Sequence, residues 1–161
     1  DVNYNMIKII GFRLSSDPTE NNFQGIKELQ GVPHWAPPEV LKSTTPALAR
    51  ALITTATDVW GLGLCLFSML FGEHLFEDVK HDEDKLAKAQ MAGEERVMKN
   101  ACKEGRKVSA EALGVVRRML RARAADRIPS THVKREQWLV RHSRASMERI
   151  GSRKNSMQKT L

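Results

Sequence analysis

One segment, Thr57–Gly72, constrains the fold of this 161-residue chain more than any other. Its interior is apolar on nearly every face, so a helix here has no polar side to turn toward water. Thr57 or Asp58 can cap the first turn, and Gly72 can end the last one. The apolar run at 59–71 is too short to cross a bilayer as a helix. The segment is therefore predicted to be a central helix that other helices cover.

Five further segments have the patterns and end signals of helices. They are Ala47–Ile53, Asp82–Ala92, Glu94–Lys103, Ser109–Arg123 and Ser130–Arg141. The second and third are polar, which is typical of helices on a protein surface. Ser130 is placed to cap the last helix, and Val133 and Trp138 are its expected contacts with the core.

The N-terminal part is predicted to differ from the rest of the chain. Met6–Ile10 contains two consecutive isoleucines and is predicted to be a short buried strand. Residues 15–30 are polar and predict a loop, and Pro33, Pro37 and Pro38 disfavour regular structure after it. The predicted fold is therefore mainly α, with a short β element at the N-terminus followed only by helices.

Composition narrows the class of protein. Hydrophobic residues make up 41% of the chain, which is enough for a packed core. The net charge is +7, and most of it lies in residues 141–161, so it belongs to a tail rather than to a nucleic-acid-binding face. The two cysteines predict neither a disulfide scaffold nor a metal site. We expect a soluble, intracellular (cytoplasmic) protein with no transmembrane segment and no nucleic-acid partner.

Four motifs occur in a fixed order along residues 6–139. They are GFR at Gly11–Arg13, GVPHWAPPE at Gly31–Glu39, TDVWGLG at Thr57–Gly63, and Arg127 followed by Ser130 and Trp138-Leu139. In that order they resemble the D-F-G, G-T-P-x-[YW] with A-P-E, D-V-W-S-x-G, and R-P-[ST]…H-P-W-[LI] motifs of protein kinases. An ordered series is far more specific than any single motif. The resemblance implies a helical kinase C-lobe of the Ser/Thr type, similar to calcium/calmodulin-dependent and calcium-dependent kinases.

The resemblance also implies structural roles for single residues. Glu39 and Arg127 are expected to form a buried ion pair that ties the end of the activation segment to the lobe. Asp58 would accept backbone N–H groups of the catalytic loop, and Gly63 would permit close approach of helices. Phe12 would pack as an apolar plug.

The segment around Gly31, Val32 and Trp35 resembles the substrate-docking loop of the family. Val32 stands where Ser/Thr kinases have a threonine that meets the catalytic Asp. The resemblance therefore implies a protein substrate or protein partner at this loop.

The residues that carry phosphoryl transfer are missing. The metal-binding Asp of D-F-G is replaced by Gly11, and Arg13 beside it would repel a divalent cation. The chain has no Gly-rich phosphate loop, no V-A-I-K lysine and no H-R-D-x-x-x-x-N loop, so the N-lobe is expected to be absent. ATP and Mg²⁺ are implied for a complete family member, but we assign no catalytic, cofactor-binding or metal-binding residue to this chain.

Two explanations account for these losses. The chain can be part of a longer kinase-like protein, which accounts for the missing segments, and the motif itself can have decayed, because Gly11 and Arg13 lie inside the matching region. We expect that both explanations apply. We expect residues 1–141 to be a partial kinase domain that is inactive alone, with a parent that phosphorylates Ser/Thr. The alternatives are a pseudokinase-like binding or scaffold module that uses the docking loop and the tail, and a non-functional gene remnant.

Several hydroxyl groups are candidates for regulation. Ser15, Ser16 and Thr19 are the hydroxyls of the predicted activation loop, although they can equally be ordinary loop residues. In the tail, residues 142–161, Ser152 and Ser156 each follow an arginine by three positions, a pattern that basophilic kinases accept.

The tail has a second candidate role in binding. Its apolar side chains lie near one helical face among cationic residues, so it can bind a calmodulin-like acidic protein or remain a solvated basic tail. These side chains are Met147, Ile150, Met157 and Leu161. The end of the tail also resembles the regulatory junction of calcium-dependent kinases.

Overall fold

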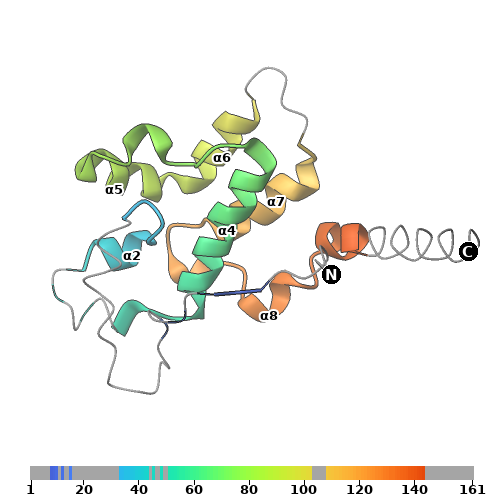
Figure 1. Cartoon of the computed structure of the whole chain (residues 1–161), viewed down its shortest axis with the longest axis horizontal. Coiled ribbons are helices and arrows are strands. Elements are labelled where there is room, and N and C mark those ends of the chain that lie inside the picture. Colours follow the sequence, from blue (N-terminus) through green and yellow to red (C-terminus); the bar gives the residue numbers. More distant parts are fainter. Residues whose placement is uncertain are drawn as a thin grey trace, which may run out of the picture.

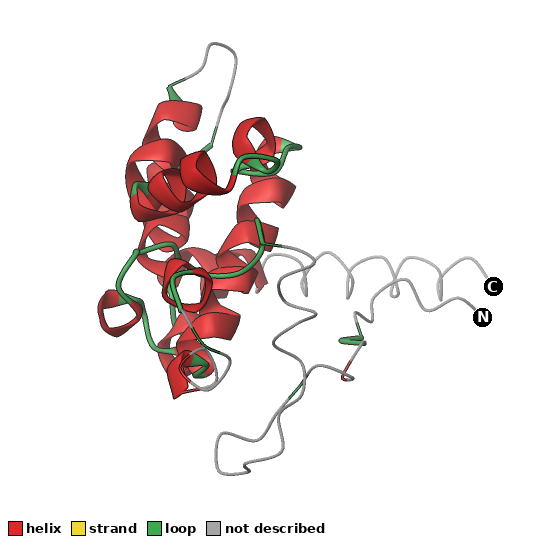
Figure 2. Cartoon of the chain, turned by 90° about the vertical axis from the view of Figure 1, so that its left-hand side faces the viewer, coloured by secondary structure: helices red, strands yellow, loops and turns green. Residues whose placement is uncertain are grey.

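The computed structural model describes residues 8–10, 12, 15, 33–43, 45, 48, 51–102 and 108–143. In these ranges the chain forms helices and loops and no strand (Figures 1 and 2). The α-helices are α2 (Pro38–Leu41), α4 (Thr55–Phe71), α5 (Glu83–Met91), α6 (Gly93–Ala101), α7 (Ala110–Met119) and α8 (Ser130–Val133), and the 3-10 helices are η2 (Glu77–Val79) and η3 (Ala124–Asp126). The chain is helical again over residues 137–143. The prediction of a mainly α, C-lobe-like fold is confirmed.

Helix α4 begins at Thr55, two residues before the predicted start at Thr57. The Thr54 side chain accepts a hydrogen bond from the Ala56 N–H at 3.2 Å, and the Thr57 side chain accepts one from the Thr54 N–H at 3.1 Å. This reciprocal arrangement is a capping box. The predicted cap at Thr57 or Asp58 is therefore wrong, because Thr54 has the extended backbone that a cap needs. Gly72 ends the helix as predicted, with a φ of 71° that favours glycine.

The core lies around α7, which packs against both α4 and α6, with α4 central in Figure 1. Its main cluster contains Trp60, Leu64, Phe67, Leu75, Phe76, Leu86, Ala89, Val97, Val116 and Leu120. A second cluster joins α4 and α7 to α8 through Val59, Val115, Met119, Ile128 and Val133, with Trp138 packed against it. The predicted core contacts of Val133 and Trp138 are therefore confirmed. Each large apolar side chain buried in this way stabilises the fold by roughly 1.5–3 kcal/mol.

Two glycines bring α4 and α6 close to the end of α7. A Cβ added at Gly63 would lie 2.9 Å from both Leu120 Cδ2 and Met119 Cβ. A Cβ added at Gly93 would lie 2.7 Å from the Leu120 carbonyl oxygen. Real Cβ atoms do not approach other atoms this closely, so the packing of these three helices requires glycine at both positions.

One face of α4 is not covered by any described residue. Leu62 is 49% exposed and Met69 is 73% exposed, and Cys65 between them is also exposed. These three residues recur at helical spacing and form one stripe. The prediction that α4 is buried on nearly every side is therefore wrong for this face, because the described helices pack only against the others.

The predicted N-terminal strand is absent from the part that the structure describes. Residues 8–10 have no regular structure, and both Ile9 and Ile10 are strongly exposed. A strand needs a second strand to satisfy its backbone groups, and the described ranges contain none. The prediction of a buried strand is wrong for these residues, while Met6 and Ile7 lie outside the described residues.

The helices predicted at Asp82–Ala92, Glu94–Lys103 and Ser109–Arg123 are confirmed with shifted ends, whereas the one predicted at Ala47–Ile53 is described only at residues 48 and 51–53. Asp82 caps α5, accepting from the Lys85 N–H at 3.0 Å, and Ser109 caps α7. The last predicted helix is divided, because α8 ends at Val133 and the chain turns before it becomes helical at residue 137. Ser130 is the first residue of α8 and makes no capping bond, so its predicted capping role is wrong. None of the described helices has the length and apolar character needed to cross a membrane.

Candidate functional site

Arg127 joins three separate segments of the described chain. It follows η3, and its backbone is fixed by hydrogen bonds on both sides, from its own N–H to Ala124 O and from the Ile128 N–H to Arg118 O. Its guanidinium lies 4.9 Å from the centre of the Trp60 ring, in a cation–π contact. The side chain is completely buried.

The guanidinium uses all five of its N–H donors. Nη1 donates to Glu39 Oε1 at 2.7 Å and Nη2 donates to Glu39 Oε2 at 2.6 Å, which makes a bidentate ion pair. The remaining three donors bind backbone carbonyls, of Ala56 at 3.0 Å, Ala122 at 3.1 Å and Arg121 at 2.8 Å. The ion pair that the sequence predicts is thus present, and it joins α2, the first turn of α4 and the end of α7.

The short helix α2 places Glu39 for this bond. Pro37 has an extended backbone and precedes the helix, and Pro38 occupies its first position, where a missing N–H is no loss. Glu39 therefore lies in the first turn, with its side chain only 14% exposed. A buried pair with complete hydrogen bonding is costly to break, because removal of one partner leaves the other charge unpaired.

The docking loop, residues 31–36, is described from Pro33 onward. Residues 33–36 form a turn in which the Ala36 N–H donates to the Pro33 carbonyl. Gln90 of α5 holds this turn from below, since its Nε2 donates to Pro33 O at 3.2 Å and to Ala36 O at 2.9 Å. Gln90 is completely buried. The loop is thereby attached to α5 as well as, through α2, to Arg127.

Three aromatic rings surround the outer side of this turn. The His74 ring lies 4.5 Å from the Trp35 ring and 5.0 Å from the His34 ring, centre to centre. Burial, and then the neighbouring His34, lower the pKa of His74 to about 4. Burial and then Lys80 also lower the pKa of His34. Both rings are therefore neutral at pH 7, and with the partly exposed Trp35 they present an uncharged aromatic surface.

The structure places the other candidates apart from this group. Asp58 is exposed in the first turn of α4, and its role as an acceptor for the catalytic loop stays a prediction. Phe12 is 67% exposed, so the prediction that it packs as an apolar plug is wrong, because no described segment covers it. Ser15 is exposed and its N–H donates to the Phe12 carbonyl at 3.0 Å. Gly63 lies in the helix contact described above.

The remaining candidates lie outside the described residues. These are Gly11, Arg13, Ser16, Thr19, Gly31, Val32, Ser152 and Ser156. The predictions that concern the metal-binding motif, the first half of the docking loop and the phosphorylation sites therefore stay predictions.

Sequence reasoning missed Gln90. The pattern of α5 was interpreted as a polar surface helix, yet Leu86, Ala89 and Gln90 are all buried. Gln90 follows the buried Leu86 by four positions on α5, so it occupies a core position of that helix. A polar residue at such a position is the signal that identifies it, because a buried amide needs hydrogen-bond partners.

Comparison with known proteins gives the family. A family model described as the protein kinase domain matches residues 1–139. The protein kinase domain-containing protein ppk9 of Schizosaccharomyces pombe is 29% identical over 84% of this chain and 22% of its own length. Serine/threonine-protein kinase 17A of Oryctolagus cuniculus is 28% identical over 85% of this chain and 31% of its own length.

A third relative matches a shorter part of the chain. Serine/threonine-protein kinase N2 of Danio rerio is 35% identical over 56% of this chain and 8% of its own length. The chain thus spans less than a third of the length of each of these relatives. No solved structure matches it significantly. Because the family model covers residues 1–139, which include α2, Glu39, Arg127 and the core helices, the chain belongs to the protein kinase domain family.

Proposed function

We propose that the chain provides the protein-docking C-lobe of a serine/threonine-kinase-like protein and does not transfer phosphate by itself. The observation that carries the proposal is the fixed position of the turn at residues 33–36, here called the docking turn. Arg127 holds α2 through Glu39, and Gln90 holds Pro33 and Ala36 directly. A loop fixed at both ends costs little ordering entropy when a peptide binds to it. The printed names of two relatives, both serine/threonine-protein kinases, support the type of parent protein.

The residues present do not fit the ATP and Mg²⁺ that a complete kinase would use. The position of the metal-binding carboxylate holds Gly11, which has no side chain to coordinate a cation. Among the described residues, no group of three or more His, Cys, Asp or Glu side chains is arranged to hold a metal ion. Phosphoryl transfer relies on positioning and on charge neutralisation, so loss of the metal ligand removes a main part of the machinery.

A phosphotransfer experiment tests the first part of the proposal. The 161-residue chain is incubated with radiolabelled ATP, Mg²⁺ and a mixture of Ser/Thr peptides. We expect no incorporation and no Mg²⁺-dependent nucleotide binding. The double variant Gly11→Asp with Arg13→Gly should restore nucleotide binding only when the preceding part of a kinase domain is supplied. Transfer of phosphate by the isolated wild-type chain would overturn the proposal.

A scaffold function is the second candidate, and the aromatic surface of the docking turn favours it. Trp35 is 37% exposed and its neighbours His34 and His74 are neutral, so a partner can bind there without catalysis. Trp35→Ala should then abolish capture of a protein partner by the chain, while Trp138→Phe, which keeps a ring in the second core cluster, should leave it unchanged. If Trp35→Ala and Trp138→Phe captured the partner equally well, the docking turn would not be the binding surface for that partner.

A further inference from the structure

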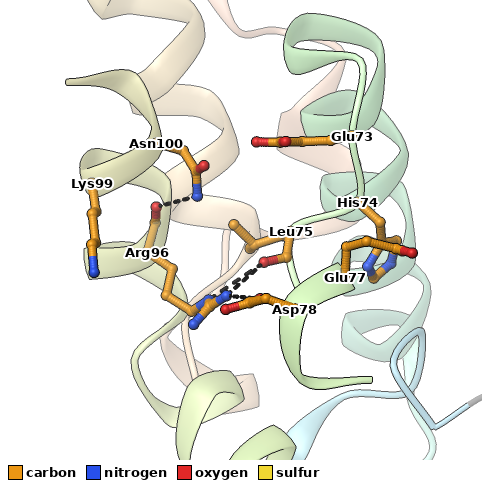
Figure 3. A pocket seen from close by; sticks show the side chains of 8 residues that line it. All are labelled: Glu73, His74, Leu75, Glu77, Asp78, Arg96, Lys99 and Asn100. Atoms are coloured by element: carbon orange, nitrogen blue, oxygen red, sulfur yellow. Dashed lines mark hydrogen bonds and ion pairs between the residues drawn. The ribbon is translucent and has the colours of Figure 1, made fainter. Parts of the chain in front are cut away.

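The polar cavity beside α6 does not require a new charged partner, because the charged groups that line it are already engaged (Figure 3). Arg96 forms an ion pair with Asp78, and Glu77 forms one with Lys80. Glu73 also has an interaction partner. The exposed apolar face of α4 differs from this cavity, because no described residue covers it.

Four residues on this face of α4 repeat at spacings of four, three and four positions. They are Asp58, Leu62, Cys65 and Met69, here called the α4 seam. A repeat that alternates between three and four positions is a heptad pattern, in which the repeated side chains pack against a second helix. All four residues are exposed, and Asp58 has no ion-pair partner among the described residues. The pattern therefore indicates that the seam is suited to a helix that carries a positive charge.

The tail contains a repeat of the same kind. Five residues follow one another at spacings of three, four, three and four positions, and they are Met147, Ile150, Lys154, Met157 and Leu161. Four of these side chains are apolar and one is a cation. A single charged residue in a heptad repeat specifies how two helices align. The α4 seam has apolar residues and one anion, so the two repeats are complementary in charge.

One alignment matches both the charges and the spacings. When Lys154 lies opposite Asp58 and the two helices are antiparallel, each step of four positions on α4 meets a step of four on the tail, and each step of three meets a step of three. In a parallel alignment the steps that start from this pair are four and three positions, so the repeats diverge. The antiparallel pairs are Asp58 with Lys154, Leu62 with Ile150, and Cys65 with Met147.

The tail begins beside this face of α4. Trp138 packs against the second core cluster, and so does Leu66 of α4. Leu66 follows Leu62 by four positions, so this cluster borders the α4 seam. Beyond Trp138 the described chain is helical up to residue 143 (Figure 1). Two antiparallel helices can be joined by about 2–5 residues, and residues 143–146 are enough for that connection.

We infer that tail residues 147–154 pack antiparallel across the α4 seam, with Lys154 opposite Asp58, in a reversible contact. Burial of apolar surface drives the contact, and the pair of opposite charges fixes its alignment. Gly151 lies within this part of the tail and lowers its helix propensity, so the tail can leave the seam while the lobe stays folded. The contact involves neither residues 33–36 nor Arg127. Its test is therefore independent of the function proposed above.

Disulfide trapping gives a direct readout, because Cys65 is a native thiol in the middle of the α4 seam. In a Cys102→Ser background, Met147→Cys adds a second thiol opposite Cys65. Oxidised glutathione accepts two electrons and two protons from the thiol pair, which leaves one S–S bond and two molecules of reduced glutathione. We expect the effective concentration of the thiol pair to be about tenfold or more higher for Met147→Cys than for Met157→Cys, which lies outside the contact. Mass spectrometry of the intact and digested chains measures the bond.

The position of the best-trapped thiol tests the alignment. Ile150→Cys lies opposite Leu62 in the antiparallel alignment, whereas it would lie opposite Cys65 in a parallel one. Stronger trapping at position 150 than at 147 would overturn the inference, and so would equal trapping at 147, 150 and 157. A disulfide between two copies would also overturn it, because the seam would then serve self-association. Circular dichroism verifies that each variant is folded.

Exchange of the two charges tests the pair that fixes the alignment. Asp58→Lys should lower trapping at position 147 about threefold, because two cations then face each other. Addition of Lys154→Asp should restore trapping. Addition of Lys159→Asp, the same charge change at a tail position outside the repeat, should not. Trapping that Asp58→Lys leaves unchanged, or that both additions restore equally, would contradict the inference.

Discussion

The two faces of α4 differ strongly in burial, although both are apolar. On one face Trp60, Leu64 and Phe67 are completely buried, and Gly63 lets α7 approach as closely as packing allows. On the other face Leu62 and Met69 are apolar and exposed. The same helix therefore has one buried, closely packed face and one apolar face that no described residue covers.

The buried face of α4 stabilises the lobe, whereas the exposed face remains available for contact with other molecules. The buried face is connected to the docking turn through Arg127, which contacts both the Trp60 ring and the Ala56 carbonyl. Substitutions there should cost stability and displace the docking turn together. Substitutions on the exposed face should change solubility and association and leave the fold intact.

The largest effect is expected from Arg127→Met. The variant leaves the Glu39 carboxylate buried without its partner, which costs about 3–5 kcal/mol of unfolding free energy. Urea denaturation followed by circular dichroism measures this loss. The double variant with Glu39→Gln should recover part of it, because the unpaired charge is then removed. A change below ~1 kcal/mol for Arg127→Met would show that the ion pair does not secure the buried side of α4.

Matched leucine substitutions compare the two faces directly. Leu64→Ala on the buried face should lower the unfolding free energy by about 2–5 kcal/mol through the lost contacts and the cavity left behind. Leu62→Ala on the exposed face should change it by no more than ~0.5 kcal/mol. Thermal and urea denaturation of the two proteins under the same conditions provide the measurement. Similar losses for both would mean that the exposed face is covered in solution, for example by self-association.

Two glycine substitutions, two positions apart on α4, compare a closely packed site with an open one. Gly63→Ala places a methyl group 2.9 Å from Leu120 and Met119 and should destabilise the chain by about 1–3 kcal/mol. Gly61→Ala meets no atom within 4 Å and should stabilise α4 by up to ~1 kcal/mol, because alanine has the higher helix propensity. Opposite signs of the two shifts in midpoint temperature are the expected result, and the same sign for both would refute it.

The smallest effect concerns pH at the end of α4, where His74 follows Gly72. The pKa of His74 is lowered from 6.5 to about 4 in the folded chain, so between these values the unfolded chain binds a proton that the folded chain does not. Stability should therefore fall as the pH decreases from about 6.5 to about 4. Denaturation midpoints at several pH values measure this, and His74→Phe should flatten the profile while His132→Asn, at an exposed site, should not.

The sequence allowed the prediction of features that depend on local pattern or on the kinase motifs. The helices α5, α6 and α7 and the glycine that ends α4 follow from spacing and end signals. The Glu39–Arg127 pair could be predicted only through the motif resemblance, because the partners are 88 residues apart and no local pattern connects them. The exposed face of α4 was not predicted, since an apolar stripe alone does not show whether anything covers it.

Other features could not be predicted from the sequence, each for a different physical reason. Gln90 lies on a core stripe, but its partners are two backbone carbonyls of a loop far away in the sequence, and sequence does not show where a loop passes. The hydrogen bond from Asn100 Nδ2 to the Arg96 carbonyl, at 3.0 Å, depends on the orientation of a buried amide, which the sequence does not show. The strand predicted at residues 6–10 depended on a partner strand that the described residues do not include.

The hydrogen bonds of Arg127 also have a consequence for the order in which the lobe is assembled during synthesis. Glu39 leaves the ribosome long before Arg127 is made, because 88 positions separate them. Helices α4, α5 and α6 can form from residues already made, whereas α2 has no bidentate partner until the last part of the lobe arrives. A nascent chain halted before residue 127 should therefore contain these helices, with residues 33–36 held only by Gln90 and α2 without its ion pair. Faster protease cleavage near Pro37 on such stalled chains would reveal it.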